Sequence, residues 1–243
     1  MKSNRTILIT GASSDLGDHL IRSIADEYEY ILAHYNHSKG QIDKAVELYG
    51  EKIVPLQADF ANKSSVENMI ADIGQEQYPD HIVHLASPKF HVQKFHKEEV
   101  SAFEMEYTAA VQSMIQILKV FIPVMAKKKY GKIIFMLTSN VVGMPAKYQT
   151  CYTTCKFALL GLMRGLAVEY ADKGICVNGI SPDMIETKFL SDIPDLMIAQ
   201  NAERSPLKKN LSVQDVIPAL KFLLSDASEM ITGINIPITG GAK

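Results

Sequence analysis

Short apolar runs alternate with helical patterns along almost the whole of this 243-residue chain. The runs are nearly continuous in apolar residues, as expected for parallel strands that helices cover on both faces. They occupy residues 6–10, 30–35, 52–57, 81–85, 132–137, 175–180 and 234–238. Helical patterns occupy residues 16–26, 41–49, 65–73, 98–128, 152–171 and 213–224. The alternation predicts one doubly wound α/β domain over residues 1–243, with a parallel sheet of about seven strands and ligands at the carboxyl ends of the strands.

Composition excludes several classes of protein. A hydrophobic content of 47% is enough for one well-buried core, and the net charge of −2 gives no basic surface for nucleic acid. No apolar run approaches the roughly 18 residues of a membrane span, and no secretory leader is expected before the first strand. Three cysteines without a CxxC pair favour the reducing cytoplasm, and the seven histidines show no metal-ligand spacing, so no metal is expected.

Helix starts and one irregular region complete the organisation. Ser64 with Glu67, and Ser212 with Asp215, are typical of helix N-caps followed by a carboxylate three residues on. Residues 188–207 have weaker periodicity, and two prolines interrupt them. This region is where a mobile lid over a substrate pocket is expected.

The first apolar run leads directly into a glycine-containing turn that opens a helix. A glycine can adopt backbone angles that let the chain turn sharply, and the first helical N–H groups then face a pyrophosphate. A plain tight turn is the alternative, since a glycine pair alone is weak evidence. If the turn holds a dinucleotide, its contacts come from Gly11, Ser13, Ser14, Leu16 and Gly17.

The second strand ends without an acidic residue. Sites for NAD often carry Asp or Glu at this point to bind the ribose 2′-hydroxyl. Here the sequence continues with Asn36, His37, Ser38 and Lys39, whose side chains can donate to a 2′-phosphate. The pattern favours NADPH over NADH, while a merely polar strand-to-helix loop is the alternative.

Tyr152 and Lys156 lie four residues apart, one turn along a helix face. A tyrosine with an unperturbed pKa near 10 needs a nearby positive charge to act as an acid–base at neutral pH, and Lys156 is placed to supply it. Ser139 lies thirteen residues before Tyr152, after the strand at 132–137, where its hydroxyl can hold a substrate oxygen. We expect these three residues to be catalytic, and the tyrosine and lysine to contact the cofactor as well.

With these motifs, the chain resembles the short-chain dehydrogenase/reductase family along essentially its whole length, and within it the 3-oxoacyl-[acyl-carrier-protein] reductases. Residues 152–161 resemble the active-site helix, 177–187 the segment around the nicotinamide, and 231–233 with 240–241 the C-terminal strand signature. The resemblance implies a Rossmann fold and cofactor contacts from Asp59 at the adenine and from Ala86, Ile185 and Thr187.

Together with the loop after the second strand and the cysteine usage, the resemblance implies an NADPH-dependent oxidoreductase of the cytoplasm. It would reduce a ketone, such as a carrier-linked 3-oxoacyl thioester, to a secondary alcohol, with Tyr152 as proton donor. Two alternatives are a non-catalytic dinucleotide-binding relative and a family member that modifies a sugar nucleotide. In the family, the helices at 98–128 and 152–171 pair with those of a neighbour, so a homotetramer or homodimer is expected.

Three departures from the family pattern stand out. Asp15 replaces the middle glycine of the turn, and residues 84–87 read His-Leu-Ala-Ser instead of Asn-Asn-Ala-Gly. The family also has a catalytic asparagine in its long fourth helix, but no Asn occurs between residues 97 and 131, and the expected place falls near Ala110. The candidate substitutes are Gln112 and Tyr107.

Overall fold

The structure is a computed structural model that describes residues 4–90 and 92–242; the remaining residues of the predicted domain, 1–3, 91 and 243, lie outside the described part. Its seven strands form one parallel sheet in the order β3-β2-β1-β4-β5-β6-β7. The strands are β1 (Thr6–Thr10), β2 (Tyr30–Tyr35), β3 (Ile53–Gln57), β4 (His81–His84), β5 (Gly131–Met136), β6 (Ile175–Pro182) and β7 (Asn235–Ile238). The helices are α1 (Asp15–Ile24), α2 (Gly40–Tyr49), α3 (Lys63–Ala71), α4 (Val100–Tyr107), α5 (Ser113–Lys128), α6 (Thr150–Tyr170), α7 (Asp195–Arg204) and α8 (Val213–Leu224). The predicted doubly wound parallel sheet is confirmed.

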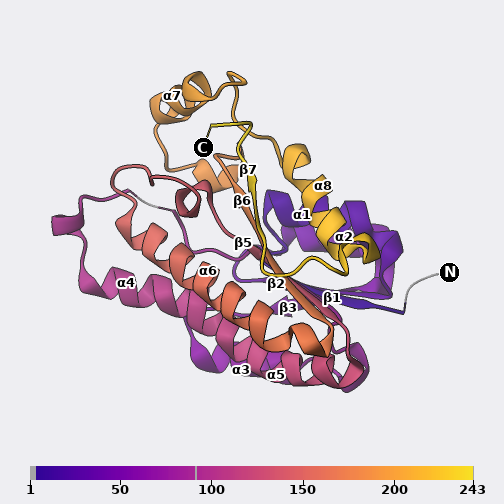
Figure 1. Cartoon of the computed structure of the whole chain (residues 1–243). Coiled ribbons are helices and arrows are strands. Elements are labelled where there is room, and N and C mark those ends of the chain that lie inside the picture. Colours follow the sequence, from indigo (N-terminus) through magenta and orange to yellow (C-terminus); the bar gives the residue numbers. More distant parts are fainter. Residues whose placement is uncertain (1–3, 91, 243) are drawn as a thin grey trace.

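Helices cover both faces of the sheet, with α3, α4, α5 and α6 on one side and α1, α2 and α8 on the other (Figure 1). Successive side chains of a strand point to opposite faces. Leu8 of β1 therefore joins the core beneath α3, α5 and α6, whereas Ile7 and Ile9 join the core beneath α1, α2 and α8. All three are fully buried, which explains why the strand sequence is continuously apolar rather than alternating.

The helix between β4 and β5 runs without a break from Val100 to Lys128. Its mean hydropathy reaches 1.6, so by length and composition it could cross a membrane, and the prediction that no apolar stretch is long enough is wrong. Half of its most apolar window is buried, and Ile117 and Phe121 are fully enclosed against the sheet. The apolar side chains therefore serve the core of this fold.

Two local predictions had different outcomes. The helix N-cap predicted at Ser212 is confirmed as a capping box, in which Asp215 accepts a hydrogen bond from the Ser212 backbone N–H over 2.7 Å. The cap predicted at Ser64 is wrong, because α3 begins earlier and Asn62 accepts from Ser65 N over 3.2 Å. The short helix α7 was also not predicted; in Figure 1 it stands apart from the layers, within the region expected to form a lid.

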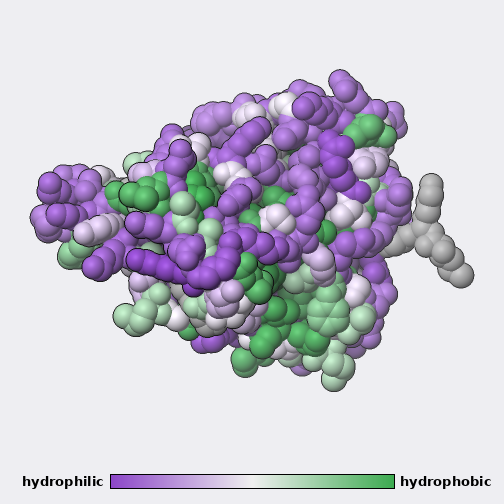
Figure 2. Space-filling view, turned by 90° about the horizontal axis from the view of Figure 1, so that it is seen from above, coloured by the Kyte–Doolittle hydropathy of each residue, from purple (hydrophilic) through white to green (hydrophobic). Residues whose placement is uncertain are grey.

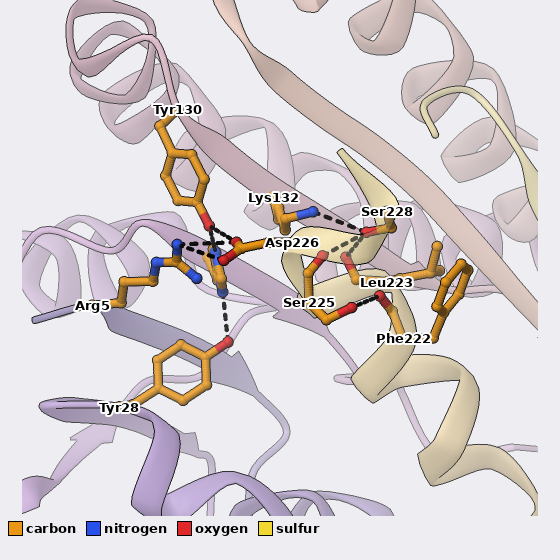
Figure 3. A network of polar contacts seen from close by, with 10 residues as sticks. Arg5, Tyr28, Tyr130, Lys132, Phe222, Leu223, Ser225, Asp226 and Ser228 are labelled. Carbon is orange, nitrogen blue, oxygen red and sulfur yellow. Dashed lines mark hydrogen bonds and ion pairs between the residues drawn. The ribbon is translucent and has the colours of Figure 1, made fainter. Parts of the chain in front are cut away.

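The direction of winding reverses between β1 and β4, which are neighbours in the sheet although two strands separate them in sequence. Ligands of such sheets bind outside the carboxyl ends of the strands at this reversal. The other, amino edge carries a polar cluster, here called the amino-edge network: Arg5, Tyr28, His81, Tyr130, Lys132, Asp226 and Ser228 (Figure 3). The reversal places the candidate site at the edge opposite to this network.

Candidate active site

The turn after β1 is built for close backbone approach. Gly11 has φ +69°, and a Cβ at this residue would lie 2.8 Å from the backbone nitrogen of Ala86 in the chain following β4. A Cβ at Gly17 would lie 2.5 Å from the Ala12 carbonyl oxygen. Ser14 caps α1 by accepting from Gly17 N over 3.1 Å. The predicted turn residues are thus brought to the amino end of α1, where the helix dipole favours an anion.

Ser13 and Leu16 lie in the same turn, Ser13 half-buried and Leu16 packed in the core beneath α1. Asp15, the residue that departs from the family, reaches out of this turn. Its Oδ2 accepts a hydrogen bond from the backbone N–H of Lys188, 2.8 Å away. The carboxylate therefore ties the phosphate turn to the start of the region predicted to be a lid.

The loop after β2 is exposed. His37 and Ser38 are exposed, and Lys39 forms an ion pair with Asp43 at 3.1 Å. Asn36 Nδ2 donates to Asp59 Oδ1 over a long 3.5 Å. The predicted 2′-phosphate donors and the predicted adenine contact are therefore neighbours at the end of β2.

Tyr152 and Lys156 lie one turn apart near the start of α6, as predicted. Lys156 is 4% exposed; its Nζ donates to the Met136 carbonyl over 2.9 Å and lies 5.5 Å from the centroid of the Tyr152 ring. Burial raises the pKa of Tyr152 to about 12 and lowers the pKa of Lys156 to about 8. Contrary to the expectation from sequence, burial outweighs any effect of the lysine charge on the pKa of the tyrosine, so Tyr152 is held protonated at neutral pH.

The side chain of Thr138 also lies near Tyr152. The hydrogen bond between the two side chains partly offsets the rise that burial causes in the tyrosine pKa. Ser139, predicted from its spacing, donates to Asp183 Oδ1 over 3.0 Å. A 3₁₀ turn, Ser139–Val141, follows β5, so Ser139 lies beyond the carboxyl end of that strand as expected, and its catalytic role stays a prediction.

The long helix widens into a π turn over Thr108–Gln112, where the family asparagine is missing. Ala110 is 2% exposed. Gln112 is exposed and Tyr107 is 40% exposed, so both candidate substitutes lie on the solvent side of the helix. The polar residue on the buried side is Glu106, one turn before Ala110 and 7% exposed. Sequence reasoning missed it, although an acid four residues before Ala110 falls on the same helix face.

Glu106 acts on the site through its charge. After burial, it is the largest influence on the pKa of Lys156, which it raises, and it also raises the pKa of Tyr152. Both effects follow from Coulomb interaction, since a nearby carboxylate favours the ammonium and disfavours the phenolate. The site therefore contains a buried acid in addition to the three residues predicted.

Two of the sequence departures meet in space. His84, at the end of β4, is fully buried, and its Nδ1 lies 2.8 Å from Thr10 Oγ1. The Ala110 carbonyl lies beside the ring, but Nε2 makes no hydrogen bond of good geometry with a described residue. Burial and the Lys156 charge lower the pKa of His84 to about 3. A neutral imidazole thus lies beside the small residue that replaces the asparagine.

The nicotinamide side of the predicted cofactor site is formed by two chain segments. Ala86 N donates to Thr10 Oγ1 over 3.3 Å, while Ile185 pairs with Leu211 in an isolated parallel bridge. Thr187 donates to the Ile185 carbonyl over 3.5 Å. The segment from Glu186 onward lines an open cleft of about 450 Å³. Its lining residues are Glu186, Thr187, Leu190, Ser191, Ile193, Asp195 and Ile198.

Comparisons with known proteins agree with this geometry. The family model described as enoyl-(acyl carrier protein) reductase matches residues 11–243. The uncharacterized oxidoreductase YmfI of Bacillus subtilis is 26% identical, covering 98% of both chains, and the 3-oxoacyl-[acyl-carrier-protein] reductase FabG of Staphylococcus epidermidis is 28% identical with the same coverage.

Among solved structures, YwfH, titled an NADPH-dependent reductase involved in bacilysin biosynthesis, has the same fold, with a TM-score of 0.87, 20% identity and coverage of 99% of both chains. The family model matches residues 11–243, and the parallel sheet and the glycine turn are consistent with that match. This chain is an NAD(P)-dependent oxidoreductase that belongs to the short-chain dehydrogenase/reductase family.

Proposed function

We propose that this protein is an NADPH-dependent ketoreductase that converts a ketone to a secondary alcohol. The observation that carries the proposal is the placement of a protonated Tyr152, with Thr138 and Lys156, at the same sheet edge as the Gly11 turn. The cofactor supplies the hydride when it is bound. Tyr152 donates the proton to the carbonyl oxygen, and Thr138 hydrogen-bonds with the tyrosine hydroxyl.

The residues at the turn fit a dinucleotide. The contacts that a Cβ would make at Gly11 and Gly17 show that only glycine lets the backbone come this close. Within the described residues, no carbonyl or side chain accepts a hydrogen bond from the N–H groups of Ser13, Asp15 or Leu16. These donors and the positive end of α1 suit a pyrophosphate.

NADPH is proposed over NADH because no acid follows β2 directly. Asn36, His37 and Ser38 are available as donors to a 2′-phosphate, and the nearby Asp59 is already bonded to Asn36 and to the backbone N–H of Ala61. Titration of both reduced cofactors by fluorescence should show a preference for NADPH of at least about tenfold, about 1.4 kcal/mol. Equal affinity, or tighter binding of NADH, would contradict the assignment.

The direct test is NADPH oxidation against ketones, including 3-oxoacyl thioesters in free and carrier-linked forms. The missing asparagine and Ala110 favour a second candidate, a dinucleotide-binding relative without turnover. Turnover with any ketone supports the reductase, whereas nucleotide binding without turnover supports the relative. A nucleotide that stays bound through purification would instead favour a sugar-nucleotide-modifying enzyme, since internal redox chemistry retains its cofactor.

Assembly and location complete the proposal. Apolar side chains on the outer face of the long helix and of α6 are exposed, among them Met105 at 60%, Phe157 at 49% and Val168 at 84%. Figure 2 shows apolar residues gathered along the lower side of the view, with smaller apolar patches elsewhere on a largely hydrophilic surface. Met114, Leu118, Leu159 and Met163 of the same helices are buried within the chain. We propose a homotetramer or homodimer in the cytoplasm, and a monomer by light scattering at micromolar concentration would contradict it.

A further inference from the structure

We propose that Phe90 and Phe189 form an aromatic clamp beside Tyr152, which selects ketones with an aromatic ring on the carbonyl over ketones with linear alkyl chains. The inference rests on the proposed function, because it names the substrate class of the same site. It is carried by two rings from distant loops: Phe90 contacts the catalytic Tyr152, and Phe189 contacts Phe90.

The geometry of the clamp is as follows. Phe90 lies in the loop after β4, and its ring meets the Tyr152 ring edge to face, with centroids 5.0 Å apart and planes at 86°. Phe189 lies in the short 3₁₀ turn Lys188–Leu190, and its ring is tilted by 49° against Phe90 at 5.8 Å. In the proposed complex, a ketone that receives the Tyr152 proton lies beside the Phe90 ring.

Polar contacts hold each ring in place through its sequence neighbour. Lys89, next to Phe90, forms an ion pair with Asp192 at 2.6 Å, which joins the loop after β4 to the lid segment. Lys188, next to Phe189, donates its backbone N–H to Asp15 at 2.8 Å. The two loops are thus connected on both sides of the ring pair. A clamp that is already formed loses less conformational entropy on binding than one that must be ordered.

The chemistry of the clamp favours a planar ligand. Aromatic rings attract one another in tilted and edge-to-face arrangements beyond what the burial of apolar area supplies, and an alkyl chain gains only the burial.

Two methyl ketones of equal carbon number, acetophenone and 2-octanone, test the clamp in NADPH-oxidation assays. We expect kcat/KM to be at least about tenfold higher for acetophenone, about 1.4 kcal/mol. Phe90→Leu and Phe189→Leu should each reduce that ratio toward one by lowering the acetophenone rate. The matched control is Phe95→Leu: Phe95 is 66% exposed, its ring contacts that of Phe103, and the substitution should leave the ratio unchanged.

A binding measurement separates the clamp from the reductase proposal. Acetophenone and 2-octanone are titrated by calorimetry into the wild type and Phe90→Leu, each saturated with NADP⁺. If neither ketone is reduced but acetophenone binds more tightly and only when Phe90 is present, the clamp stands and the reductase proposal fails. If 2-octanone is reduced as well as acetophenone, or if Phe90→Leu lowers both rates equally, the rings merely close the site and the clamp is overturned. Absence of any Phe90-dependent binding overturns it as well.

Discussion

The amino and carboxyl edges of the sheet both bury a histidine and a lysine, but these residues have different roles at the two edges. At the amino edge, β4 begins with His81 and β5 carries Lys132, which is 2% exposed. At the carboxyl edge, β4 ends with His84, and Lys156 donates to the end of β5 at Met136. Burial lowers the pKa of both histidines to about 3 and lowers the pKa of both lysines. Residue type and burial therefore do not distinguish a structural cluster from a catalytic one.

The hydrogen-bond partners of these buried residues distinguish the two edges. In the amino-edge network, the two His81 nitrogens contact the hydroxyls of Tyr28 and Tyr130, and Lys132 donates to Ser228 over 2.9 Å (Figure 3). At the other edge, His84 Nε2 has no good partner among the described residues. Buried polar groups are normally paired, so a closed network indicates structure and an open one indicates a place where a ligand completes the bonding.

The largest expected effect comes from substituting one tyrosine at each edge of the sheet. Tyr152→Phe should lower kcat by about 10³-fold with NADPH binding nearly unchanged, because only the proton donor is lost. Tyr130→Phe should keep kcat but lower the free energy of unfolding by about 1 kcal/mol, because His81 loses a hydrogen-bond partner. Steady-state kinetics and urea unfolding measure both. Near-full activity of Tyr152→Phe would show that the catalytic assignment is wrong.

The next effect concerns the buried lysines. Below about pH 8 folded Lys156 carries a charge that burial disfavours, while the unfolded chain holds its proton up to a pKa near 10.5. Between these values the unfolded state binds more protons, so wild-type stability rises with pH. Lys156→Met should therefore be the more stable protein at pH 7, by up to about 3 kcal/mol, with the advantage closing as pH rises from 8 to 10.5.

The same variant should lose most of its activity, because Lys156 is placed to act on both Tyr152 and the cofactor ribose. Lys132→Met at the amino edge is the matched control, and it should keep kcat per folded molecule. Thermal unfolding across this pH range, with kinetics at pH 7, checks both lysines. A Lys156→Met protein that is active, or whose stability runs parallel to the wild type at every pH, would contradict the assignment.

A smaller effect sharpens which hydroxyl serves the site. Thr138→Ala should lower kcat by about 10- to 100-fold, since a hydrogen bond to a group that becomes charged contributes about 1.5–3 kcal/mol. Thr138→Ser should restore most of the rate, because it returns the hydroxyl. Ser139→Ala should have the weaker effect, since its hydroxyl bonds to Asp183. The reverse order would support the prediction made from spacing alone.

Much of the fold could be predicted because hydrophobic periodicity, and the residues that begin and end helices and strands, are local properties of the sequence. All seven strands were expected within a residue or two, since parallel strands buried on both faces are continuously apolar. The helix α7 escaped prediction because none of its residues is buried, so it has no apolar stripe to produce a pattern. The long helix was predicted, but its π turn was not, because no periodicity of side chains marks it.

The candidate site was only partly predictable. The motif spacing predicted the Tyr152–Lys156 pair and the Gly11 turn, because each of these two motifs lies within one local element. Thr138 and Glu106 were missed because their effects on the pKa values of the catalytic pair depend on which segments converge, and sequence distance does not record this. The sign of the Tyr152 shift was also missed, because burial was not known and it outweighs a charge one turn away.

The smallest expected effect compares acids at the two edges. The charge of Glu106 raises the pKa of both Tyr152 and Lys156, whereas Asp226 raises that of Tyr130 in the amino-edge network. Glu106→Gln keeps the shape of the side chain and removes the charge, so both catalytic pKa values should fall. The pH profile of kcat should then move to lower pH, while kcat at pH 7 changes by less than about tenfold, about 1.4 kcal/mol. Asp226→Asn should leave the profile in place, because its charge acts at the far edge of the sheet. A profile that moves to higher pH, or that moves equally in both variants, would show that Glu106 has no specific influence on the catalytic pair.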